Sequence, residues 1–371
     1  MADTSGNVNR NGEDDDETNG RSVPAIDEGP PACLASPGRS KRLILHVDLN
    51  NTILVSDAAT SQGTVAALEY FMTTVTWGKM NKGKWEWLSD SPSLLPPCDD
   101  ATSYYSQFGY TGTHGFTSAA GRRFRGILNE HLKLLRWPKG LKGDRDLTIK
   151  AEDGHLYHWI LPSFFQLLID LTQQGTPFAV HFRTFGCDLI RVLSAVSKAV
   201  TEGAHPVFPD LPDLKLSVNK TAGKIRCSTK EVVVARGGER LSSRDGERSL
   251  YEYFSAANGL GGFQDDYDWW LTNNYSARGG KPLWVDPFDE TVQHIFIDDN
   301  IRQNDEDTVV HPKVFLAPGS ADTRMASISE LYDVALIQTD LLKAVSEPDY
   351  FTRRVRICQE NYEKNVLQGS G

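Results

Sequence analysis

Three short apolar runs along this chain each end in polar residues of the kind that bind ligands or metal ions. They are Leu43–Val47 before Asp48, Pro177–Phe182 before Thr184, and His294–Ile297 before Asp298 and Asp299. Short apolar runs bounded by polar residues are typical of buried strands. In open α/β sheets, ligands bind at the carboxyl ends of the strands. We therefore expect three strands that deliver these polar side chains to one edge of a sheet.

The segments between these runs contain patterns typical of helices and of a hairpin. Apolar residues at helical spacing, from Ile160 to Leu171, predict a helix over residues 157–174. Pro348 suits the first turn of a C-terminal helix over residues 348–367. The remaining expected elements are helices at 122–137, 188–199 and 250–256, a hairpin at 224–228 and 231–236, and a strand at 314–316.

A lysine, Lys281, stands upstream of the paired acids Asp298 and Asp299. The resulting order is strand–Asp, strand–Thr, Lys and strand–Asp–Asp, which resembles the haloacid dehalogenase-like (HAD) superfamily over roughly residues 41–335. The resemblance implies an α/β, Rossmann-like fold, with a central parallel sheet flanked by helices and one or two cap-like insertions. It also implies that Asp48, Thr184, Lys281 and Asp298 converge at the carboxyl ends of neighbouring parallel strands.

The resemblance also implies a role for each of these residues. Asp48 would attack phosphorus and form an aspartyl-phosphate, Thr184 would hydrogen-bond the phosphoryl group, and Lys281 would neutralise charge. Mg²⁺ would be held by the carboxylates of Asp48, Asp298 and Asp299 and by the backbone carbonyl of Asn50. The residue types suit this ion, because Mg²⁺ prefers oxygen ligands and clustered carboxylates need a cation.

Three further residues are candidates for substrate binding: Asn50, Thr52 and Arg183. Asn50 and Thr52 belong to the first motif, which reads Asp-x-Asn-x-Thr instead of the family's Asp-x-Asp-x-Thr. Arg183 precedes Thr184 at a strand end, where it could form a fork with a substrate oxygen or pair with an acid in the wall of the site.

The asparagine at position 50 weakens the prediction of an ordinary phosphatase. In family phosphatases the second Asp protonates the leaving oxygen and then activates water, and an amide can do neither. Three interpretations stay open: a hydrolase for substrates with good leaving groups, a hydrolase that recruits an acid from a cap, or a catalytically silent protein. We expect a Mg²⁺-dependent hydrolase or phosphatase that works through Asp48. The alternative is a silent HAD-fold protein that binds a phosphate-bearing ligand or a protein partner.

Spacing along the chain divides it into a core and insertions. The stretch between Thr52 and Thr184 far exceeds the about 30 residues of a minimal strand–helix–strand unit. The second insertion could be another cap or an elaboration of the core. The expected division is a disordered acidic tail at 1–40, a core at 41–55, 156–205 and 276–340, a cap-like insertion at 56–155, a second insertion at 206–275, and a C-terminal helical segment at 341–371.

Charge and composition limit the partners and the compartment. The net charge is −10, yet residues 121–145 and 220–248, in the two insertions, each hold eight basic side chains. Such clusters favour an anionic partner, a phosphorylated small molecule or a phosphoprotein, although they could also be solvated faces. The acidic pI of about 5.4 argues against nucleic acid. The five cysteines are widely spaced, and neither a signal peptide nor a membrane-spanning run is visible, so we expect a cytoplasmic protein.

Overall fold

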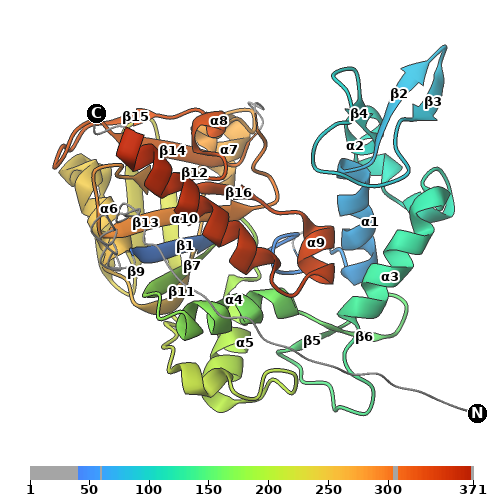
Figure 1. The fold of residues 1–371 in the computed structure, drawn as a ribbon, viewed down its shortest axis with the longest axis horizontal. Helices are drawn as coiled ribbons and strands as arrows, with labels where there is room; N and C mark the ends of the chain where they lie inside the picture. Colours follow the sequence, from blue (N-terminus) through green and yellow to red (C-terminus); the bar gives the residue numbers. More distant parts are fainter. Residues whose placement is uncertain (1–40, 59–60, 304–307, 369–371) are drawn as a thin grey trace, which may run out of the picture. The chain divides into compact units, whose positions relative to one another are not determined.

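An eight-stranded sheet forms the centre of the computed structural model, which describes residues 41–58, 61–303 and 308–368 (Figure 1). In order across the sheet, the strands are β10 (Glu239–Ser242), β9 (Val232–Arg236), β8 (Gly223–Cys227), β11 (Gly259–Gln264), β7 (Phe178–Thr184), β1 (Arg42–Val47), β13 (Val292–Asp298) and β16 (Leu336–Gln338). Across the sheet, β8, β11, β7, β1, β13 and β16 are each parallel to the next strand, whereas β10, β9 and β8 are antiparallel to one another in turn. The chain is therefore mixed α/β, with a large and mostly parallel central sheet, as the sequence predicted.

Side chains alternate between the two faces of the sheet along its three middle strands, β7, β1 and β13. One face joins the main apolar cluster through Val180, Phe182, Leu43, Leu45, Val47, Ile295 and Ile297. The residues between them point to the other face because strand side chains have a period of two. These are partly polar and include His46, His181, Arg183 and Phe296. The second face therefore buries polar side chains that need partners.

Helices cover both faces of the sheet. The first face packs against α4 (Pro162–Gln173), α5 (Leu189–Glu202) and α10 (Tyr350–Gln368), each of which contributes to the main apolar cluster. Figure 1 shows α10, in red, running across the sheet near β13 and β16, in agreement with its contacts. The opposite face packs against α6 (Glu247–Ser255), whose Phe254 joins Phe263 of β11 in a second cluster. These elements confirm the predicted helices, with shifted ends.

A second, three-stranded sheet lies against this opposite face. Its strands are β12 (Lys281–Val285), β14 (Val310–Phe315) and β15 (Thr323–Met325), in that order. Leu283 of β12 packs with Phe296 of β13 in a shared apolar cluster. Lys281 is thus the first residue of a strand outside the central sheet. The expectation that Lys281 stands at the carboxyl end of a neighbouring parallel strand is wrong on this point.

The segment expected as a cap-like insertion, residues 56–155, forms strands that do not belong to the central sheet. Its core is aromatic, since the ring of Trp87 stacks on Tyr104 at 5.5 Å and meets Phe124 edge-on at 5.1 Å. The α-helices and strands from α1 to β6 are α1 (Thr64–Thr74), β2 (Trp77–Asn81), β3 (Lys84–Trp87), β4 (Thr102–Ser103), α2 (Tyr104–Phe108), α3 (Arg125–Leu135), β5 (Thr148–Lys150) and β6 (Leu156–His158). The helix predicted from residue 157 begins only at Pro162 because β6 comes first.

The segment expected as a second insertion, residues 206–275, supplies four strands of the central sheet, β8 to β11. Of the two alternatives, the structure shows an elaboration of the core. The predicted hairpin is β8 and β9. The other helices are α7 (Tyr267–Thr272), α8 (Ile328–Leu331), α9 (Leu341–Ser346) and short 3-10 turns at 110–112, 116–118, 122–124, 211–214, 243–245 and 277–279. The expected acidic tail at 1–40 lies outside the described residues.

Candidate active site

Three neighbouring strands bring their polar ends together at one edge of the central sheet. Asp48 follows the last residue of β1, Asp298 is the last residue of β13, and Thr184 is the last residue of β7. The register aligns them, because Val47 pairs with Phe182 on one side and with Ile297 on the other. Apart from the origin of Lys281, the convergence predicted from the sequence is confirmed.

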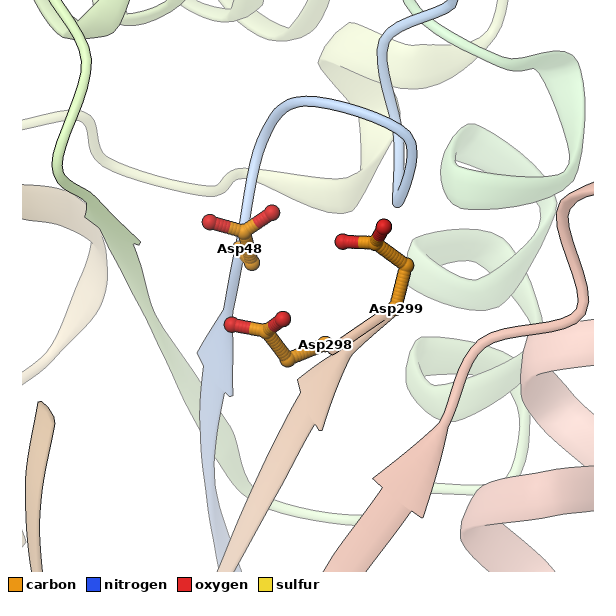
Figure 2. A group of neighbouring side chains, drawn as sticks. All are labelled: Asp48, Asp298 and Asp299. Carbon is orange, nitrogen blue, oxygen red and sulfur yellow. The ribbon is translucent and has the colours of Figure 1, made fainter. Parts of the chain in front are cut away.

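The carboxylates of Asp48, Asp298 and Asp299 form a compact cluster. Each offers one oxygen, and the three oxygens lie within 4.8 Å of one another. Figure 2 shows Asp48 above the end of β1 and the two other carboxylates at the end of β13, all turned toward one another. Asp48 and Asp298 are 7% and 1% exposed. Negative charge is therefore concentrated where water can screen little of it.

The crowding of these acids changes their protonation. Burial and the charge of Asp298 raise the pKa of Asp48 to about 7, and Lys281 only partly offsets the shift. Burial and the charges of Asp298 and Asp48 also raise the pKa of Asp299 well above its usual value. A divalent cation among these oxygens would reverse both shifts, since an opposite charge favours the ionised form.

Lys281 reaches this cluster from the second sheet. Its ammonium donates to Asp48 Oδ1 over 2.6 Å, to Asp298 Oδ2 over 2.8 Å and to the backbone carbonyl of Arg183 over 3.3 Å. Burial alone would lower the pKa of Lys281, but the charges of Asp298 and Asp48 outweigh it and raise the pKa above its usual value. Lys281 therefore stays charged and neutralises two of the three acids.

Thr52 orders the loop after β1. Its side chain is fully buried, and its hydroxyl accepts a hydrogen bond from the backbone N–H of Asp299 over 3.1 Å. The loop also contains Asn51 in a left-handed conformation (φ 57°), which asparagine tolerates better than most residues. Thr52 thus positions the acidic loop that follows β13, whereas the sequence suggested that it binds substrate.

The side chain of Asn50 is oriented by two hydrogen bonds from its amide group. Nδ2 donates to the carbonyl of Ser56 over 2.8 Å and to the carboxylate of Asp188 over 3.0 Å. Oδ1 of Asn50 therefore points toward Gly186. A Cβ placed on Gly186 would lie 3.2 Å from this oxygen and 3.3 Å from Thr184 Oγ1, so the two oxygens face the same space. Position 50 thus presents a hydrogen-bond acceptor on the side of Thr184.

Arg183 lies inside the protein and not on the surface of the site. Its side chain has no exposed area and forms two hydrogen bonds with Asp265, over 2.6 and 2.9 Å. It also donates to the carbonyl of Pro282 over 3.1 Å, next to Lys281. Of the two roles considered for Arg183, the structure shows pairing with an acid in the wall. The prediction that Arg183 binds substrate is therefore wrong.

No protein-family model, curated protein or solved structure matches this chain. The arrangement of the site must be interpreted from its own residues. In the part of the chain that the structure describes, no helix has both the length and the apolar character needed to cross a bilayer.

Two acids of this region were missed in the sequence. Asp188 precedes α5 and follows β7 closely, so a search for polar residues just after predicted strands would have included it. Asp265 follows β11, whose sequence Gly-Leu-Gly-Gly-Phe-Gln has little of the β-branched character of a strand. Asp188 could therefore have been predicted from the sequence, whereas no strand is predicted before Asp265.

The donor set of the cluster fits a hard divalent cation such as Mg²⁺. All its side-chain donors are carboxylate oxygens, and they come from two loops that Thr52 links. Hydrogen bonds fix Asp298 further, since its Oδ1 accepts from the backbone N–H of Asn300 over 2.9 Å. Asp48, Asp298 and Asp299 are therefore the residues that could hold the ion, and the backbone carbonyl of Asn50 stays a predicted fourth donor.

Proposed function

We propose that this protein is a Mg²⁺-dependent phosphoryl-transfer enzyme of the HAD type, which hydrolyses a phosphorylated substrate through an aspartyl-phosphate on Asp48. One observation carries the proposal. A buried carboxylate at a strand end, Asp48, is bound by a buried lysine and clustered with two further acids. Phosphoryl transfer needs mainly positioning and neutralisation of charge, and these residues supply both.

Each residue has a role that follows from its hydrogen bonds. Asp48 attacks phosphorus through a carboxylate oxygen, and Lys281 stabilises the negative charge of the phosphoryl oxygens. Thr184 Oγ1 accepts from the backbone N–H of Gly186 over 2.9 Å, so its own hydrogen is free to donate to the phosphoryl group. When bound to Asp48, Asp298 and Asp299, Mg²⁺ would neutralise charge on the phosphoryl oxygens.

Asn50 limits the substrates that such an enzyme could hydrolyse quickly. Its amide has no titratable proton, and both of its N–H hydrogens are used by Ser56 and Asp188. General acid–base help is typically worth about 10²–10⁴-fold in rate. We therefore propose substrates whose leaving group needs no proton, such as acyl phosphates or aryl phosphates. Oδ1 of Asn50 can still accept a hydrogen bond from the water that hydrolyses the aspartyl-phosphate.

The nature of the substrate beyond its phosphate follows only from charge. We propose an anionic, phosphorylated small molecule or a phosphoprotein, because the basic residues cluster in the two segments at 121–145 and 220–248. The second candidate function is a catalytically silent phosphate-binding protein. The observation that favours it is the asparagine at position 50, whose hydrogen bonds need no substrate.

The test measures phosphate release from acetyl phosphate and p-nitrophenyl phosphate, in Mg²⁺ and in EDTA. We expect turnover only with Mg²⁺, and its loss in Asp48→Asn, which keeps the shape of the side chain and removes the nucleophile. Asp268→Asn is the matched control, since Asp268 is exposed on α7. An acid-stable, hydroxylamine-sensitive phosphate label should form on the parent and not on Asp48→Asn. Equal turnover of parent and Asp48→Asn would contradict the proposal.

A further inference from the structure

A cavity lies in the part of the fold opposite to the candidate active site. Its volume is about 300 Å³, the lower end of the range for small-molecule sites. It is lined by the first halves of β7 and β11, by Arg236 at the end of β9 and by the residues that end α6. Asp48 and Thr184 lie at the other ends of the strands, so the two sites do not share residues.

Gly261 lets the guanidinium of Arg236 lie close to the sheet because it has no side chain. In the register of β11 and β7, Gly261 is paired with His181, and the guanidinium of Arg236 lies over the glycine. A Cβ on Gly261 would lie 3.3 Å from Arg236 Nη2. The guanidinium also lies 4.0 Å from the ring centre of Phe263, two residues farther along β11. The strands β7 and β11 thus form one side of the cavity, and the guanidinium of Arg236 and the side chain of His181 border it.

Arg236 has unused hydrogen-bonding capacity. It donates to the carbonyl of Gly262 over 3.1 Å, but its buried Nε has no hydrogen-bond partner. Within the described ranges, no carboxylate forms an ion pair with it, although a guanidinium offers five donors. Burial lowers the pKa of Arg236 from its usual value, and the charges of Tyr253 and Glu239 offset this only in part.

His181, which lines the same cavity, has an unused hydrogen-bond acceptor. The side chain is 2% exposed, and its Nε2 lies 3.3 Å from the carbonyl of Phe254. A carbonyl only accepts, so the ring hydrogen is on Nε2 and Nδ1 carries a lone pair. Nδ1 has no partner among the described residues. The cavity therefore combines unused donors of Arg236 with one unused acceptor.

The surroundings of the cavity favour a negative ligand. None of the described residues that line it is acidic, although the chain as a whole carries a net charge of −10. Its rim includes Asn258, whose side chain accepts a hydrogen bond from Arg42 over 2.8 Å and thereby holds a second guanidinium nearby. Tyr253, Ala256 and Ala257 add apolar wall.

We propose that this cavity binds a small organic carboxylate that carries a hydroxyl or amino group next to the carboxylate and an apolar tail. Arg236 binds the carboxylate, because the planar guanidinium matches its two oxygens. Nδ1 of His181 accepts the hydrogen of the neighbouring hydroxyl or amino group. Neither contact depends on the chemistry of Asp48, so this proposal stands or falls independently of the proposed function.

Isothermal titration of the full chain in EDTA tests the proposal with three probes: phenyllactate, 3-phenylpropanoate, which lacks only the hydroxyl, and inorganic phosphate. We expect saturable binding of phenyllactate and weaker binding of 3-phenylpropanoate. Arg236→Gln should weaken phenyllactate binding by roughly tenfold to a hundredfold, the usual effect of losing hydrogen bonds to a charged group. Arg240→Gln is the matched control, since Arg240 is exposed on the same hairpin and does not line the cavity.

A second variant keeps the test decisive if Arg236→Gln folds poorly. Asn219 lines the cavity, and its Oδ1 accepts from the backbone N–H of Thr221 over 2.9 Å, a bond that an aspartate keeps. Asn219→Asp should therefore fold normally and weaken phenyllactate binding through charge repulsion. The proposal is overturned if phenyllactate does not bind, if neither variant weakens it, or if phosphate binds more tightly than phenyllactate in an Arg236-dependent way.

Discussion

The side-chain amide of Asn50 donates a hydrogen bond to the carboxylate of Asp188 over 3.0 Å, and Asp188 also accepts from the backbone N–H of Ala58 over 3.2 Å. Position 50 therefore lies beside an acid that the resemblance to HAD phosphatases did not reveal. An aspartate at position 50 would meet a second carboxylate at hydrogen-bonding distance. A carboxyl group introduced at position 50 as a general acid would therefore be placed next to the charge of Asp188, so both positions must be changed together.

The first prediction concerns the stability of Asn50→Asp. We expect the free energy of unfolding to fall by about 1–3 kcal/mol, because the new carboxylate repels Asp188 and leaves the carbonyl of Ser56 without its donor. Adding Asp188→Asn should recover part of this loss, since the exchanged pair keeps its mutual hydrogen bond and its total charge. Urea unfolding at neutral pH in EDTA measures both changes. A single variant as stable as the parent would show that the two side chains do not interact.

The same exchange tests the catalytic role of the missing acid. Only the double variant, Asn50→Asp with Asp188→Asn, has an uncrowded carboxylate at position 50. We expect it to raise turnover on sugar phosphates, whose alkoxide leaving groups need a proton, by up to about 10²-fold. Turnover of acetyl phosphate should change little, and this substrate serves as the internal control. An equal gain on both substrates would point to a general effect on binding instead.

The sequence was sufficient to predict the strands that carry the site. The runs that became β1, β7 and β13 are short, apolar and bounded by polar residues, so their ends could be placed within one or two positions. Their burial on both faces explains why they are apolar nearly throughout. The clustering of Asp48, Asp298 and Asp299 followed from the rule that parallel strands end at the same edge.

The features that were missed depend on contacts between distant parts of the chain. Lys281 reaches Asp48 from a separate sheet, and no local pattern distinguishes such a strand from one in the central sheet. Arg183 and Thr52 carry polar groups that could bind a substrate, but both form hydrogen bonds inside the protein. Arg183 donates to Asp265, and Thr52 accepts from the backbone N–H of Asp299. A sequence shows which groups can form hydrogen bonds, whereas partner choice requires the fold.

The buried pair of Arg183 and Asp265 should be essential for stability. Asp265→Asn removes the negative charge and leaves the guanidinium of Arg183 incompletely paired in the interior. We expect the free energy of unfolding to fall by about 3–5 kcal/mol, as when one partner of a buried ion pair is lost. The control is Asp349→Asn, whose exposed pair with Arg353 should be worth less than about 1 kcal/mol. Chemical denaturation distinguishes the two, and equal effects would contradict the prediction.

Lys281 should be the cation that allows the acidic cluster to fold without metal. Lys281→Met leaves Asp48 and Asp298 without their shared donor, and we expect a loss of about 3–5 kcal/mol in EDTA. Mg²⁺ should recover part of this loss, because the ion binds only the folded cluster. Lys343→Met is the control, since Lys343 lies 3.7 Å from Asp340 at an exposed position. If Mg²⁺ stabilises Lys281→Met no more than it stabilises Lys343→Met, the ion does not bind this cluster.

The last prediction concerns pH and follows from Asp48. Its pKa is about 7 in the folded protein, against 3.8 for an unperturbed aspartate, so the folded state holds its proton more tightly than the unfolded state. Stability from this group is therefore complete below about pH 4 and is lost as the pH rises through about 7. The raised pKa of Asp299 adds a change in the same direction.

Comparison with Asp48→Asn removes both the Asp48 carboxyl and its effect on the pKa of Asp299, while the remaining titrating groups are shared. In EDTA, we expect the parent to lose about 2–3 kcal/mol relative to Asp48→Asn between about pH 5 and pH 8, at roughly 1.4 kcal/mol per pH unit between the two pKa values. Mg²⁺ favours the ionised carboxylates, so it should flatten the pH dependence of the parent, and Asp298→Asn should blunt that effect of Mg²⁺. Urea midpoints across this range measure all three proteins. If the stability of the parent changes with pH in the same way as that of Asp48→Asn, with or without Mg²⁺, the prediction fails. The pKa of Asp48 would then be the same in the folded and the unfolded protein, and the acids would not act as one charged site.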